Sequence, residues 1–146
     1  MSATGIRATT TLTAVVDALR RLRGTRLAVA TSYLPDIDAR LVNVLHGSGF
    51  EVVAIRGLGL TRSVDMGKVM PAETYRLARE VTRAAPNADA ILISCGNLRS
   101  FEAIEPLEAD TGLPVVTSNQ AALWQALRIV GVGEPVANLG RLLKEF

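Results

Sequence analysis

The sequence has few of the residues that most chemical sites in proteins use. Its 146 residues include one cysteine and one histidine, and aromatic residues make up 4% of the chain. A single cysteine cannot form a disulfide within the chain, which is typical of a protein of the reducing cytoplasm. No Cys, His and Asp grouping has metal-ligand spacing, and no GxGxxG or Walker pattern is present. We therefore expect neither a metal nor another cofactor.

Long apolar runs and a strong excess of charge are also missing. No run approaches the roughly 18 apolar residues that a membrane-spanning helix needs. Residues 1–13 are rich in Thr and lack the charged-then-apolar order of a secretory leader. The 16 Lys and Arg residues are nearly balanced by 14 Asp and Glu residues, which gives a net charge of +2. These absences predict a cytoplasmic protein that binds neither membranes nor nucleic acid.

What is present is a globular composition, 49% apolar and 21% charged, that fits a single domain. Buried strands are expected at 27–31, 51–55, 90–94 and 114–117, with a β-prone piece at 6–11. Helices are expected at 12–23, 39–46, 71–85, 101–111 and 120–130, the second capped by Asp36 or Asp38 and the last by Ser118 or Asn119. Residues 56–70 are expected to be a long connection. The alternation predicts an α/β fold: a parallel sheet of about four strands with helices on both faces.

The stretch that organises this pattern is Ala90–Ser94, an almost wholly apolar segment followed directly by Cys95. Ligands of open α/β sheets bind beyond the carboxyl ends of the strands, where we expect Cys95 to lie. The positive end of a following helix dipole favours the thiolate there. Cys95 is therefore a candidate nucleophile or proton-transfer group, although a buried cysteine after a strand is also a common packing residue.

The beginning and the end of the chain share a pattern. Thr4-Gly5-Ile6, Thr10, Ala14 and Leu19-Arg20 run parallel to Thr111-Gly112-Leu113, Thr117, Ala121 and Leu127-Arg128, with a one-residue shift. The start of the chain thus looks like the end of another α/β unit. The alternative is that any two strand–turn–helix units share such a pattern.

Several motifs resemble one protein family over essentially the whole chain. They are Ser94-Cys95-Gly96-Asn97-Leu98-Arg99, Ile104-Glu105-Pro106-Leu107-Glu108, 112–120, Thr31-Ser32-Tyr33 and Gly57-Leu58-Gly59-Leu60. They are similar to the second half of the aspartate/glutamate racemase superfamily, in the branch of maleate cis-trans isomerases and arylmalonate decarboxylases. Members of the family have two pseudo-symmetric lobes that hold the substrate between them. The resemblance implies that residues 24–146 form a second lobe. Residues 1–23 then match the closing strand and helix of a first lobe, the rest of which has no counterpart in this sequence.

The resemblance also implies a chemistry for Cys95, which matches the second-lobe cysteine. In decarboxylases of this branch that thiol protonates a planar enediolate after carbon dioxide leaves, and in isomerases and racemases two thiols act from opposite sides. Asn97-Leu98-Arg99 is closer to the isomerases, so a cofactor-independent isomerase acting on a small dicarboxylate is the first hypothesis. Arylmalonate-type decarboxylation, or racemisation with a second chain's thiol, is the alternative. A third hypothesis is that the chain is a non-catalytic half, which needs a first-lobe partner or assembles as a homo-oligomer.

The candidate substrate-binding residues are Tyr33, Ser63, Gly96, Asn97, Thr117 and Ser118. Tyr33 matches the family's tyrosine that donates to the substrate carboxylate, and Ser63 stands where isomerases usually carry an asparagine. The N–H groups of Gly96 and Asn97 can cradle a carboxylate or simply form a turn. Thr117 and Ser118 end the neighbouring strand, where Ser118 can also act as a helix cap.

Overall fold

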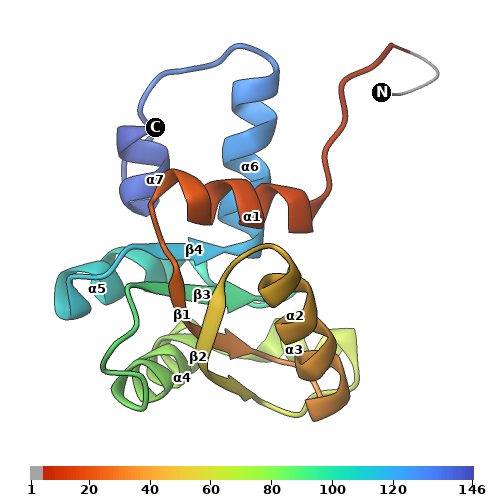
Figure 1. The fold of residues 1–146 in the computed structure, drawn as a ribbon, viewed down its shortest axis with the longest axis vertical. Helices are drawn as coiled ribbons and strands as arrows, with labels where there is room; N and C mark the ends of the chain where they lie inside the picture. The colour runs from red at the N-terminus through yellow and green to blue at the C-terminus, as the bar shows by residue number, and fades with distance from the viewer. Residues whose placement is uncertain (1–4) are drawn as a thin grey trace.

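The computed structural model describes residues 5–146, in which helices and strands alternate around one sheet (Figure 1). The strands are β1 (Arg26–Thr31), β2 (Glu51–Gly57), β3 (Ala90–Ser94) and β4 (Val115–Thr117). The helices are α1 (Thr11–Arg21), α2 (Pro35–Gly47), α3 (Ser63–Lys68), α4 (Pro71–Arg83), α5 (Phe101–Thr111), α6 (Ser118–Ile129) and α7 (Gly140–Glu145).

The four strands form one parallel sheet in the order β2-β1-β3-β4. The chain builds outward from β1 to β2 on one side and then crosses to β3 and β4 on the other. The order therefore reverses between β1 and β3, and such a switch point opens a crevice at the carboxyl ends of the two strands. The predicted parallel sheet of four strands is confirmed.

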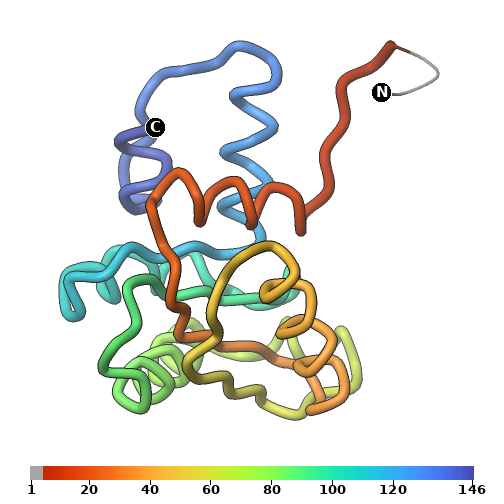
Figure 2. Tube along the Cα trace, viewed as in Figure 1, coloured from red at the N-terminus to blue at the C-terminus, as the bar shows by residue number. Residues whose placement is uncertain are grey.

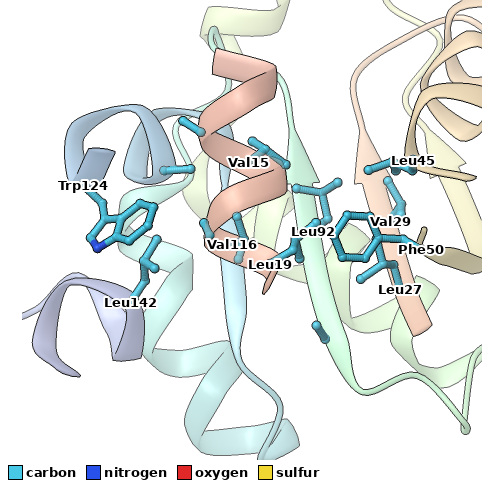
Figure 3. Packing of buried hydrophobic residues seen from close by; sticks show 14 of the residues in the cluster. Val15, Leu19, Leu27, Val29, Leu45, Phe50, Leu92, Val116, Trp124 and Leu142 are labelled. Atoms are coloured by element: carbon cyan, nitrogen blue, oxygen red, sulfur yellow. The ribbon is translucent and has the colours of Figure 1, made fainter. Parts of the chain in front are cut away.

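One face of the sheet, called the first face below, is covered by α1, α2, α6 and α7 (Figure 3). Alternate residues of the strands reach it, among them Leu27 and Val29 of β1 and Leu92 of β3. Trp124 of α6 packs into the same cluster. The N- and C-terminal parts of the described chain thus meet on this face.

The opposite face, called the second face, is covered by α4 and α5. Ala28 and Ala30 of β1 and Ile93 of β3 point to it, and Cys95 packs in the same cluster. Helices therefore cover both faces, which confirms the predicted architecture. Because both faces of the sheet are covered, all five residues of β3 are buried, which explains its near-continuous apolar sequence.

The expected β-prone piece at 6–11 is wrong for the described residues. Residues 5–10 form no strand and extend away from the sheet (Figure 2), and Thr11 already begins α1. A strand needs a neighbour for its backbone groups, and none of the four strands pairs with this segment. Residues 1–4, including Thr4 of the internal similarity, lie outside the described residues.

The expected helix caps are also wrong. Asp36 and Asp38 lie inside the first turn of α2, whose N-cap is Leu34, with Pro35 as the first helical residue. The N-cap of α6 is Thr117, so Ser118 is already helical. Thr10 and Thr117 cap α1 and α6 in the same way, each accepting a hydrogen bond from the backbone N–H three residues on. The internal similarity of the sequence thus corresponds to two equivalent N-caps.

Two helices lie where the sequence pattern predicts none. The short α3 forms within the expected connection 56–70, and α7 forms near the C-terminus with Leu142 and Leu143 fully buried. The Glu108 carboxylate of α5 accepts hydrogen bonds from the backbone N–H groups of Val115 and Arg141, which ties α5 to β4 and α7. Within residues 5–146 no helix is long and apolar enough to cross a membrane.

Candidate functional site

The carboxyl ends of β1 and β3 bring Tyr33 and Cys95 together. Thr31 and Ser94 are the last paired residues of the two strands, so the residues that follow them leave the sheet side by side. The Tyr33 hydroxyl interacts with the side chains of both Ser94 and Cys95. Burial raises the pKa of the Tyr33 phenol above its ordinary value of 10.0; the neighbouring Cys95 adds to this, and the hydrogen bond with Ser94 opposes it. Tyr33 is therefore a protonated hydrogen-bond donor at neutral pH.

The Cys95 thiol is held between the turn that follows β3 and α3. Only 3% of the residue is exposed, and its sulfur lies 3.8 Å from the Met66 sulfur. The backbone N–H of Asn97 donates to Cys95 Sγ at 3.4 Å, and such a bond is stronger to a thiolate than to a thiol. The N–H that donates to the sulfur therefore belongs to a turn and not to the start of a helix, because α5 begins only at Phe101. This geometry differs from the expected role of the Asn97 N–H as a carboxylate donor.

A cavity of about 450 Å³ opens beside this point on the first face. Apolar side chains of α1 and α2 form most of its wall, and its polar lining consists mainly of Tyr33, Arg40, Ser94, Gly96 and Ser118. Asn119 Nδ2 donates to the Gly96 carbonyl at 2.9 Å, which fixes the turn after Cys95 against the first turn of α6. Arg40 adds a positive charge, so the cavity suits a small carboxylate with an apolar part.

The structure separates the other predicted site residues. Ser118 lines the cavity, whereas the fully buried Thr117 hydroxyl accepts the N–H of Gln120 as a cap, so the structure exchanges the two expected roles. Ser63 is the exposed first residue of α3 and does not line this cavity. Of the six predicted substrate-binding residues, Tyr33, Gly96 and Ser118 therefore lie on it.

Residues that the sequence did not reveal support Tyr33. The Thr31 hydroxyl donates to the Asp38 carboxylate at 2.6 Å and accepts the Tyr33 backbone N–H at 3.2 Å. Burial raises the pKa of Asp38 above 3.8, and the Thr31 hydrogen bond opposes that rise. Together the two residues fix the loop that carries Tyr33. No local signal in the sequence pairs residues 31 and 38.

Metal-binding groups do not gather here. Among residues 5–146 no three His, Cys, Asp or Glu side chains come close enough to hold a metal ion. The chemistry available is that of a thiol, a protonated phenol, turn N–H groups and one guanidinium. This set can bind a carboxylate and move a proton.

Comparison with known proteins identifies the family. The model of the arylmalonate decarboxylase family matches residues 1–143. The chain belongs to this family. It is 39% identical over 144 residues to the arylmalonate decarboxylase of Bordetella bronchiseptica, which covers 98% of this chain and 60% of that protein. A maleate isomerase of Nocardia farcinica is 28% identical over 133 residues, which covers 90% of this chain and 52% of that protein.

Solved structures of the arylmalonate decarboxylase family and its neighbours share the fold. A crystal structure of arylmalonate decarboxylase superposes with a TM-score of 0.90 and 39% identity, over 97% of this chain and 62% of that one. The Nocardia farcinica maleate cis-trans isomerase bound to TRIS superposes with a TM-score of 0.89 and 25% identity, over 94% of this chain and 55% of that one. The chain thus spans about 60% or less of the length of these relatives. The predicted racemase-like branch is confirmed.

Proposed function

We propose that Cys95 is the proton donor of an arylmalonate-type decarboxylase half-site, which a first lobe completes. The observation that carries this proposal is the meeting of Cys95, Tyr33 and the Gly96 turn at the carboxyl ends of β1 and β3. The identity of 39% to a decarboxylase against 28% to a maleate isomerase leads us to place decarboxylation before isomerisation.

The reaction needs one bond to break and one to form. The bond between the central carbon and one carboxylate breaks, carbon dioxide leaves, and the electron pair stays on the substrate as a planar enediolate. Cys95 Sγ–H then gives its proton to that carbon, and the thiolate recovers a proton from solvent. The Asn97 N–H, 3.4 Å from the sulfur, stabilises the thiolate between these two steps.

The retained carboxylate becomes more negative in the enediolate, so its hydrogen bonds strengthen as the reaction proceeds. We assign Tyr33 to this carboxylate, because its raised pKa keeps the phenol protonated. Cys95 packs on the second face and does not line the cavity, so we assign the cavity to the rest of the substrate: Arg40 attracts the dicarboxylate, and the apolar wall from α1 and α2 accommodates the aryl group. Ser63, Asn97 and Thr117 remain predicted site residues whose contact with substrate would have to come with the first lobe.

The first lobe is part of the proposal because a half-site leaves one side of a planar intermediate uncovered. Several large apolar side chains around the cavity are partly exposed, namely Leu12, Leu34, Ile37 and Val44. Exposed apolar patches of this kind mark interaction surfaces. We infer that this surface meets either a first-lobe polypeptide or another copy of the chain, and that the substrate is held between the two.

The test uses phenylmalonate and maleate in heavy water, with the chain alone and with the Cys95→Ser variant. Decarboxylation predicts phenylacetate with one deuterium on the carbon next to the carboxylate, formed by the chain and not by the variant. Conversion of maleate to fumarate instead supports the isomerase hypothesis. If neither reaction occurs, the part of the Bordetella protein that this chain does not match is joined ahead of residue 1. An inactive but folded chimera would refute the proposal.

A further inference from the structure

Buried hydroxyl groups without hydrogen-bond partners gather at the end of the sheet that carries Cys95. Within residues 5–146 the hydroxyls of Ser32, Thr74 and Ser100 have no partner, and each residue is at most 2% exposed. Ser32 directly follows β1, Thr74 lies in the first turn of α4, and Ser100 directly precedes α5. Helices that cross over between parallel strands run antiparallel to them, so all three hydroxyls lie toward the carboxyl ends of the strands.

The strand register places Ser32 beside Cys95. Ala30 pairs with Ile93, both on the second face, and Thr31 pairs with Ser94, both toward the first face. Ser32 follows β1 and Cys95 follows β3, and extending the alternation of side chains one residue past each strand directs both residues to the second face. Cys95 does pack in the second-face cluster.

Thr74 lies over the same place from the helix side. Leu77 and Ala78 of α4 pack in the second-face cluster with Ala30 of β1. Thr74 is about one turn before them, a rise of about 5.4 Å along the helix. Ser32 is two residues beyond Ala30, which is about 6.6 Å along the antiparallel strand. The two steps match, so Thr74 lies above Ser32.

Two other threonines within the helices bond a backbone carbonyl of their own helix, whereas Thr74 does not. The Thr82 hydroxyl donates to the Ala78 carbonyl four residues earlier, at 2.7 Å. Thr111 makes the same bond within α5, at 2.6 Å. This local bond is the usual way to satisfy a threonine within a helix. The Thr74 hydroxyl makes no such bond, which leaves it available to another group.

We propose that Ser32 and Thr74 hold a buried water molecule that donates a hydrogen bond to Cys95 Sγ. Buried waters in proteins typically make about three hydrogen bonds to buried polar groups, and the two unpartnered hydroxyls together with the Cys95 sulfur supply that number. The water gives the buried thiolate a second donor beside the Asn97 N–H. Ser32 and Thr74 are then positioning residues for the thiolate, a role whose purpose rests on the proposed function of Cys95.

The test is the pH titration of the Cys95 thiolate, followed by its ultraviolet absorbance. The chain has a single cysteine, so Cys95→Ser is a complete blank. Loss of one hydrogen bond to a charged sulfur should raise the midpoint of the titration by about one pH unit in Ser32→Ala and in Thr74→Val. Because both hydroxyls hold one water, the double variant should shift no further than either single variant. Thr82→Val, on the same helix, should leave the midpoint unchanged.

The outcome that overturns the proposal is a midpoint in Ser32→Ala that equals that of Thr82→Val. A hydroxyl that holds no water would also make Ser32→Ala more stable than the unchanged chain, since its removal relieves an unpaired polar group. Ser32→Ala removes one oxygen atom from a small side chain and decides the question by itself if Thr74→Val does not fold. The titration needs no turnover, so it stands apart from the test of the decarboxylase activity.

Discussion

Gly57, the last residue of β2, offers a direct test of how the site loop is held. An alanine Cβ there would lie 2.4 Å from the Tyr33 carbonyl oxygen, 2.6 Å from Asp38 Oδ2 and 2.8 Å from Thr31 Oγ1. The φ of Gly57 is not positive, so the effect of Gly57→Ala comes from these contacts rather than from backbone strain. The methyl group would therefore push on the three residues that fix the Tyr33 loop.

The loss of stability expected in Gly57→Ala depends on which atoms the new methyl group would contact. Overpacking by one methyl group costs about 1–3 kcal/mol, and we expect the upper half of that range because one of the obstructing atoms is a backbone carbonyl oxygen. With a urea m-value of about 2 kcal/mol/M, a loss of about 2 kcal/mol lowers the unfolding midpoint by about 1 M. Displacement of Tyr33 should also weaken the binding of any carboxylate at this place.

The matched control is Gly47→Ala, at the last residue of α2, where a new Cβ meets no atom within 4 Å. Alanine is favoured over glycine in a helix by roughly 0.5–1 kcal/mol, so this variant should be neutral or more stable. Urea unfolding of both variants, followed by circular dichroism, is the measurement. Equal midpoints for Gly57→Ala and Gly47→Ala would refute the account of how the Tyr33 loop is held.

Three further predictions concern charged and polar groups. Burial opposes ionisation of Asp89, but hydrogen bonds from the Thr25 side chain and from the Thr25 and Arg26 N–H groups, with the Arg26 charge, give a net lowering of its pKa. Asp89→Asn should therefore lower the free energy of unfolding by roughly 1–2 kcal/mol at neutral pH. Urea unfolding at a series of pH values should show this loss vanish as the pH falls from 3.8 through the lowered pKa of Asp89. A loss that stays the same at acid pH would contradict the prediction. Glu108→Ala should lower the free energy of unfolding by roughly 2–3 kcal/mol in the same assay, because the N–H groups of Val115 and Arg141 lose their acceptor. A loss as small as that of the exposed Glu102→Ala would refute the role of Glu108 in tying α5 to β4 and α7. Tyr33→Phe should lower turnover of a decarboxylated substrate more than its binding, because the phenol's hydrogen bond strengthens with the enediolate charge; a change in KM alone would contradict that role.

Within the fold, the parts that the sequence predicts well are those set by local composition. Ala90–Ser94 is the predicted strand to the residue, because a strand buried on both faces needs an unbroken apolar run. Gly112 ends α5 in the left-handed conformation that glycine adopts without strain, as its position in the sequence suggests. The errors lie where a contact distant in the sequence decides. Thr9 and Thr10 favour a strand but belong to none of the four strands of the sheet, and Thr117 rather than Ser118 caps α6 because Gln120 completes a capping box with Thr117.

The sequence by itself determined that this is an α/β chain with a thiol at a strand end and a resemblance to one enzyme branch, because periodicity and short motifs are local properties. Only the tertiary structure decided that β1 and β3 are neighbours, since strand order depends on pairings between distant residues. That pairing brings Tyr33 to Cys95. It also places Ser118 on the cavity and leaves the hydroxyls of Ser32 and Thr74 buried without a partner among the described residues. No local pattern carries such information, because Tyr33, Cys95 and Ser118 lie far apart in the sequence and meet only in the folded chain.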